Sequence, residues 1–260
     1  MEEVQYRRYF IRLSYEGTNF CGWQFQKNNE SVQESIEKVL TLLCKTPQKI
    51  LGCGRTDAGV HADDFYAHWD YPFALPDKLL MKMNSLLSRS VAIKEIFEVP
   101  REAHARFDAT VRKYHYFIHI HKNPFKRLYS FEYLYHALNY EMMQKVATKL
   151  LDFNEFLPLI KLDKEHKKTK CTLYTSELIQ LSETEWRYEV SANRFLHNMV
   201  RRIVGTMLLV GRDKLSFDEF VESMEAQTEM KYIQLAPSNG LHLVDITYPF
   251  LSEKQTEILL

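Results

Sequence analysis

The sequence predicts an α+β fold made of two similar halves, each with an antiparallel sheet and helices on one face. Some segments alternate apolar and polar side chains with the period of two that half-buried strands show. Others repeat apolar side chains at helical spacing, twice behind a capping box. The inferred elements follow the order β-α-β-β-α-β twice. That order is typical of ferredoxin-like units, so we expect two such halves side by side with a cleft between them.

The first half, predicted as a domain of residues 1–103, begins with a strand over 9–15, where Tyr9, Ile11 and Leu13 share one face. A loop with two glycines follows, and Ser31-Val32-Gln33-Glu34 predicts the capped start of a helix over 31–45. The remaining predicted elements are a short strand at 49–51, a strand over 65–71, a helix over 79–87 and a strand over 91–99.

The second half, predicted as residues 104–260, repeats this order without residue-level identity to the first. Its expected elements are a strand over 114–120, a helix over 141–152, a hairpin of 172–181 with 186–192, a helix over 195–210 and a strand over 241–248. Gly211 stands where a left-handed helix cap is usual. Ser216-Phe217-Asp218-Glu219 is a second capping box and predicts a short helix.

Composition is that of an ordinary soluble globular protein, with 45% hydrophobic and 26% charged residues. No apolar run is long enough to span a bilayer, and the first residues lack the layout of a signal peptide, so we expect a cytoplasmic protein without a membrane partner. The four cysteines are scattered without a C-x-x-C pair. Neither a zinc site nor a disulfide framework is therefore indicated.

Charge is balanced overall, with 34 basic and 34 acidic residues, but it is unevenly distributed. Seven Lys and Arg residues against two acids lie between Arg101 and Arg127, and five lysines against two acids lie between Lys161 and Lys170. Such segregation can form a basic face for a phosphate backbone. On charge alone, ordinary solvated surfaces are the better explanation.

Three of the eight glycines, Gly52, Gly54 and Gly59, surround the segment Arg55-Thr56-Asp57. Glycine is favoured where φ is positive or where another backbone comes close, so we expect a tightly shaped loop that presents the Asp57 carboxylate to a substrate. The spacing matches neither a dinucleotide-binding G-x-G-x-x-G nor a P-loop. A plain turn capped by Asp57 explains the spacing equally well.

Other catalytic patterns are missing from the sequence. The ten histidines form no metal-binding motif, and there is no Gly-x-Ser-x-Gly elbow. Carboxylate chemistry without metal or cofactor remains. Its candidate supports are Arg55, the tyrosines Tyr114 and Tyr116, and either Arg201 or Arg202, since an arginine is costly to bury in an apolar helix without a partner.

Residues 54–62, Gly-Arg-Thr-Asp-Ala-Gly-Val-His-Ala, resemble the active-site signature of the tRNA pseudouridine synthase A family. Four further blocks resemble that family in the same order, at 15–26, 104–116, 193–205 and 236–241. The resemblance thus covers nearly the whole chain and implies the pseudouridine synthase fold. A glycosidase that pairs Asp57 with Asp63 or Asp64 explains none of these blocks.

The resemblance implies a homodimeric isomerase, without metal or cofactor, that converts uridines to pseudouridine on the 3′ side of the tRNA anticodon stem-loop, at tRNA nucleotides 38–40. By resemblance, Asp57 is the nucleophile, Tyr114 stacks on the target base, Arg201 pairs with Asp57, and Arg55 contacts RNA at the flipped nucleotide. The chain departs from the family pattern at 152–173 and at Phe65, which bears on substrate range and RNA grip. A non-catalytic RNA-binding relative of the same fold is the alternative.

Overall fold

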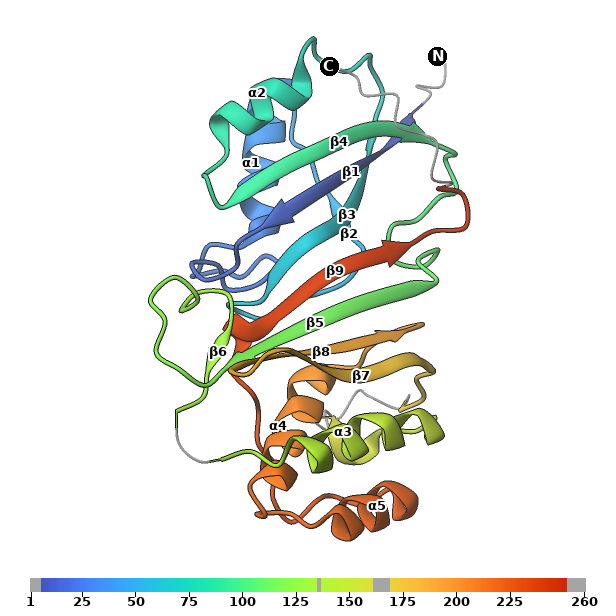
Figure 1. The fold of residues 1–260 in the computed structure, drawn as a ribbon. Coiled ribbons are helices and arrows are strands. Elements are labelled where there is room, and N and C mark those ends of the chain that lie inside the picture. The colour runs from blue at the N-terminus through green and yellow to red at the C-terminus, as the bar shows by residue number, and fades with distance from the viewer. Residues whose placement is uncertain (1–5, 135–136, 161–168, 252–260) are drawn as a thin grey trace. The chain divides into compact units, whose positions relative to one another are not determined.

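The computed structural model describes residues 6–134, 137–160 and 169–251. They form two compact units, one within Met1–Thr110 and Leu243–Leu260 and the other within Val111–His242. Each unit combines antiparallel strands with helices, which confirms the mixed α+β class (Figure 1). Among the described residues, no helix combines the length and the apolar character needed to cross a membrane.

The first unit contains the predicted β-α-β-β-α-β order. Its elements are β1 (Arg7–Tyr15), α1 (Val32–Cys44), β2 (Leu51–Gly52), β3 (His61–Tyr71), α2 (Leu79–Leu86), β4 (Val91–Val99) and most of β9 (Leu241–Thr247). The strands follow the order β4-β1-β3-β9, and β2 pairs with β3. The last strand of the sequence therefore lies with the first unit.

The core of this unit lies between the sheet and its two helices. Strand β1 places Tyr9 opposite Trp69 and Leu13 opposite Phe65, and all four side chains are buried. Helix α1 is capped at its N-terminus by Ser31, whose side chain accepts a hydrogen bond from the amide of Glu34. The Glu34 carboxylate does not return to the cap; it pairs with Lys38 at 2.8 Å, so only half of the expected capping box forms.

The second unit contains β5 (Val111–His119), β6 (Phe131–Glu132), α3 (Tyr140–Lys149), β7 (Leu173–Ser182), β8 (Glu185–Ala192), α4 (Met199–Gly211) and α5 (Phe217–Ala226). Short 3-10 turns lie at Leu150–Asp152, Leu157–Leu159 and Ser238–Gly240. The strand order is β5-β8-β7, and β6 pairs in parallel with β5. The predicted β7–β8 hairpin and the capping box of Ser216 with Glu219 are confirmed.

Both ends of α4 differ from the prediction. The helix begins at Met199 and not at 195, because Asn198 takes the left-handed conformation with φ 61°. Gly211 is the last helical residue and has no positive φ, so the expected glycine cap was wrong. Its small size serves packing against α3: a Cβ at Gly211 would lie 2.8 Å from Cγ of Met143.

Candidate active site

Asp57 lies in the loop that joins β2 to β3, between two strands as the sequence predicts. The ends of the loop are anchored, because the Cys53 amide donates to Tyr66 O at 2.8 Å and both Cys53 and Val60 are buried. Within the loop the Val60 amide donates to Asp57 O at 3.2 Å, which closes a tight turn. Asp57 is half-buried and Arg55 is exposed.

The three glycines of this loop serve different purposes. Only Gly59 has a positive φ, 77°. Gly52 is packed under the indole of Trp23, which a Cβ would approach to 2.5 Å. A Cβ on Gly54 would meet no described atom within 4 Å. Positive φ and close approach therefore account for two of the three glycines.

A second loop, residues 16–24, packs against the Asp57 loop and is called here the bracing loop. The Trp23 amide donates to Thr56 O at 3.2 Å, and the Gly59 amide donates to Phe20 O at 3.3 Å. The hydroxyls of Tyr15 and Thr56 lie 2.8 Å apart and are buried. Because these bonds fall on both sides of Asp57, they hold its backbone in place.

Phe65, which we expect to differ from the family pattern, supports the bracing loop. Its ring is fully buried and stacks on Trp23 with centroids 4.1 Å apart and planes 28° apart. The departure therefore lies in the core beneath the site.

His61 is a second link between the two loops and was not singled out from the sequence. Its Nδ1 accepts the Gly17 amide at 3.1 Å, and the Glu16 carboxylate lies 3.6 Å from the same nitrogen. Because Nδ1 accepts this hydrogen bond, the proton of the neutral imidazole lies on Nε2. The two glycines of the bracing loop were the sequence signal for this close contact.

In the second unit, Arg201 lies in the first turn of α4. Its Nε donates to Ala236 O at 2.8 Å, and the Ala236 amide donates to the Arg201 carbonyl at 3.1 Å. The Nε bond orients the guanidinium group, and the backbone bond ties the segment of Ala236 to α4. Arg202 turns elsewhere, with Nη1 donating to Ile160 O. The two arginines between which the sequence pattern did not decide therefore bind different acceptors, Ala236 O for Arg201 and Ile160 O for Arg202.

The segment around Ala236 is also tied to β5. The Tyr116 hydroxyl donates to Pro237 O at 2.8 Å. Burial raises the pKa of Tyr116 well above its usual range, and the positive charge of Arg201 only partly offsets this rise. Tyr116 is therefore a neutral hydrogen-bond donor that supports the segment carrying Arg201.

Tyr114 lies two residues earlier on β5 and is half-buried. Its ring meets that of Phe195 edge to face, with centroids 5.1 Å apart at 88°. Edge-to-face packing fixes a ring without covering both of its faces. The structure therefore brings Asp57 and Arg55 together in the first unit and holds Tyr114 and Arg201 in the second. The meeting of the two pairs stays a prediction.

Part of the basic stretch between Arg101 and Arg127 is neutralised. Lys113 pairs with Glu189 at 2.8 Å, and Lys126 pairs with Glu185. The other basic stretch lies mostly at residues 161–168, outside the described residues.

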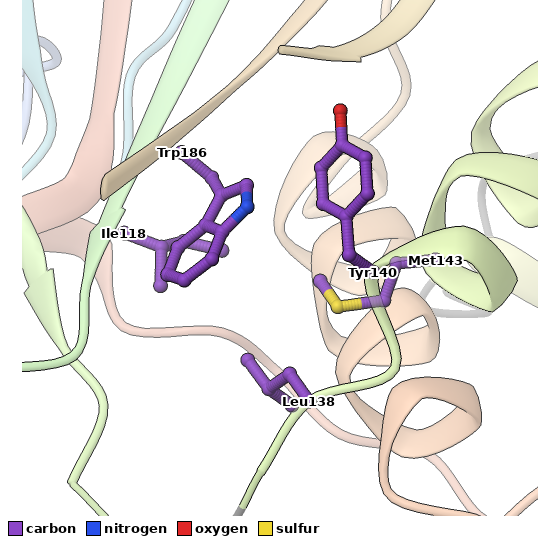
Figure 2. A pocket seen from close by; sticks show the side chains of 5 residues that line it. All are labelled: Ile118, Leu138, Tyr140, Met143 and Trp186. Atoms are coloured by element: carbon purple, nitrogen blue, oxygen red, sulfur yellow. The ribbon is translucent and has the colours of Figure 1, made fainter. Parts of the chain in front are cut away.

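A small pocket in the second unit is unrelated to these residues. It has a volume of about 10 Å³ and is lined by Ile118, Leu138, Tyr140, Met143 and Trp186 (Figure 2). The Tyr140 hydroxyl is already committed to Leu178 O at 2.6 Å. The lining is apolar and the space holds about one water, so the pocket is a packing defect and no substrate site.

Comparisons with known proteins find similar sequences over nearly the whole chain. A sequence model of a family described as tRNA pseudouridine synthase matches residues 151–249. A Bacteroides fragilis protein named tRNA pseudouridine synthase A is 42% identical over 246 residues, 94% of this chain and 97% of its own length. Proteins of the same name are 40% identical in Bacteroides thetaiotaomicron, over 97% of this chain and 96% of that protein, and 33% identical in Chlamydia muridarum, over 94% and 92%.

Proposed function

This chain belongs to the tRNA pseudouridine synthase A family, and we propose from that premise that it converts uridine to pseudouridine in tRNA. The observation that carries the proposal is 42% identity over 94% of the chain, because a match of that length includes both units and therefore both groups of candidate residues. The anchored Asp57 loop supports the proposal from the side of the chemistry. A carboxylate held on a braced loop suits a reaction that needs a positioned nucleophile.

The reaction balances within the substrate. The bond between N1 of uracil and C1′ of the sugar breaks, and a bond between C5 and C1′ forms. C5 loses its proton and N1 gains one, so uridine and pseudouridine are isomers. A nucleophile that attacks the nucleoside divides this rearrangement into easier steps, because it holds one fragment while the uracil turns.

We assign the roles as follows. Asp57 is the nucleophile, Arg201 pairs with it and keeps it ionised and aimed, and Tyr114 stacks on the target base. Arg55, exposed two residues before Asp57, contacts the RNA where the nucleotide leaves the stack. Extruding a base costs a few kcal/mol, which stacking and phosphate contacts in the site offset. The hydrogen bond from Arg201 Nε to Ala236 O supports this assignment, since a fixed guanidinium is a better partner for a carboxylate.

The finer features of the proposal follow from the family. The substrate region is the 3′ side of the anticodon stem-loop, at tRNA nucleotides 38–40, and the enzyme acts as a homodimer in the cytoplasm without a cofactor. We further propose that residues 1–103 and 104–260 correspond to two ferredoxin-like halves and that the active site lies in a cleft, as in the family.

The test is to incubate the protein with an unmodified tRNA transcript and to map pseudouridine by carbodiimide labelling and primer extension. Wild type is expected to form product. Asp57→Asn, which keeps the size of the side chain but removes its charge, is expected to form none while binding tRNA with wild-type affinity. Product at the wild-type rate in Asp57→Asn would exclude Asp57 as nucleophile. Binding without product by wild type, on every tRNA, would favour the non-catalytic relative.

A further inference from the structure

The loop between β5 and β6 carries the most exposed large apolar side chain among the described residues. This loop, residues 121–130, is called here the Phe125 loop (Figure 1). Phe125 is 90% exposed. Burial of a phenyl ring is favourable, so a ring this exposed is available to pack against a binding partner.

The Phe125 loop is held by its own hydrogen bonds. The Phe125 amide donates to Oδ1 of Asn123 at 3.0 Å, and the Lys126 amide donates to Asn123 O at 3.1 Å. The amides of Tyr129 and Ser130 both donate to Lys126 O at 3.0 Å. Successive turns therefore set the backbone on both sides of the ring.

The loop is also tied to the segment that orients Arg201. Nδ2 of Asn239 donates to the carbonyls of Arg127 and Ser130, each at 3.0 Å. Asn239 lies three residues after Ala236, the acceptor of the Arg201 Nε bond. The Phe125 loop and the Arg201 guanidinium are thus fixed to one short stretch of the second unit.

The sequence on both sides of Phe125 is basic. Lys122 and Arg127 are exposed on either side of Phe125, and in the part of the chain that the structure describes neither forms an ion pair. Of the acids that contact this loop, Glu185 is paired with Lys126, and Glu132 accepts the Asn123 amide at 3.2 Å and keeps its negative charge. An exposed aromatic ring between two cations matches single-stranded nucleic acid, which offers a base to the ring and phosphates to the cations.

We infer that the Phe125 loop is an RNA-contacting element, in which Phe125 stacks on an unpaired base or ribose of the bound tRNA and Lys122 and Arg127 contact its phosphates. The inference rests on the proposed function and extends it beyond the residues assigned above. A protein partner fits less well, because a ring flanked by two cations matches an anionic surface better than an apolar one.

The experiment measures the affinity of an unmodified tRNA transcript as a function of salt. Phe125→Ala is expected to weaken binding by about tenfold without changing the slope of log K against log salt, because stacking releases no counterions. Phe125→Trp should restore affinity. The double variant Lys122→Gln with Arg127→Gln should reduce the slope by about 1 for each lost phosphate contact.

Phe73→Ala is the matched control, because Phe73 is 60% exposed in the first unit and lies outside the basic stretches. An unchanged affinity in Phe125→Ala would overturn the inference. So would a shift of Phe125→Ala from dimer to monomer in light scattering with unchanged affinity per chain, since the ring would then serve a protein interface. Pseudouridine mapping of wild type distinguishes these outcomes from failure of the proposed function. If wild type forms product and Phe125→Ala binds tRNA with unchanged affinity, the role of Phe125 is refuted and the proposed function stands.

Discussion

Replacing Gly22 by alanine tests whether the bracing loop sets the position of Asp57. A Cβ at Gly22 would lie 2.3 Å from Thr56 O and 3.0 Å from the carbonyl carbon of Asp57. Ordinary contact begins near 3.4 Å, so the Thr56 carbonyl must move by about 1 Å. Both atoms are backbone atoms, and no side-chain rotation can relieve the contact. Gly22 also has φ 97°, which an alanine adopts only with strain.

A displacement of about 1 Å at a reacting group costs on the order of 100-fold in rate. We therefore expect Gly22→Ala to lower kcat about 100-fold. The strain of about 1–2 kcal/mol should lower Tm by a few degrees, so the variant is expected to remain folded. The rate is measured in single turnover by release of tritium from tRNA labelled at uridine C5, because the C5 hydrogen is lost in the reaction.

Gly54→Ala is the stability control within the same loop, because its Cβ would meet no described atom within 4 Å. Its Tm should equal that of wild type. A folded Gly22→Ala enzyme with wild-type kcat would refute the bracing role. A loss of tRNA affinity with unchanged kcat would show that residues 16–24 contact RNA instead of positioning Asp57.

Three other predictions follow from single contacts. Tyr15→Phe removes only the hydroxyl bonded to Thr56 at 2.8 Å, so kcat should fall by about two- to tenfold with unchanged KM; an equal rise in KM would argue against positioning. Arg201→Met should lower turnover far more than tRNA affinity, measured by the same tritium release and by titration; loss of affinity alone would make Arg201 an RNA contact. Burial lowers the pKa of His68 to about 4. As the pH falls, His68 is therefore protonated in the unfolded chain before it is protonated in the folded protein, and the free energy of unfolding should fall by about 2 kcal/mol from pH 7 to pH 5. His68→Asn retains an acceptor for the Ala105 amide. Its free energy of unfolding, measured with urea, should no longer show this decrease between pH 7 and pH 5, and an unchanged pH profile would show that other groups cause the decrease.

Local pattern was enough to predict most elements of both units. The strand over 91–99 was predicted with its observed bounds, and the β7–β8 hairpin lies within a residue or two of its predicted position. Alternation and helical spacing act over a few residues, so they can be read without knowing the fold. The position of Asp57 between two strands was likewise predicted, because the strand that follows it alternates apolar and polar residues.

Contacts distant in sequence could not be predicted in this way. The Tyr15–Thr56 and Gly17–His61 bonds join residues 41 and 44 positions apart, and the sequence signalled them only through glycines whose purpose was open. The same limit explains the error at Gly211, where a neighbouring helix and not a turn requires the small residue. It also explains Lys113, which belongs to a basic stretch of the sequence but is paired with Glu189 on the neighbouring strand β8.

The sequence by itself determined the element order, the family and the identity of the candidate residues, because these are encoded in short periods and contiguous motifs. Only the tertiary structure decided which side chains brace the Asp57 loop, which of the two α4 arginines is oriented by Ala236, and that Phe125 stands exposed on a fixed loop. Each of these depends on what lies across a packing interface, and adjacency along the chain carries no information about that neighbour.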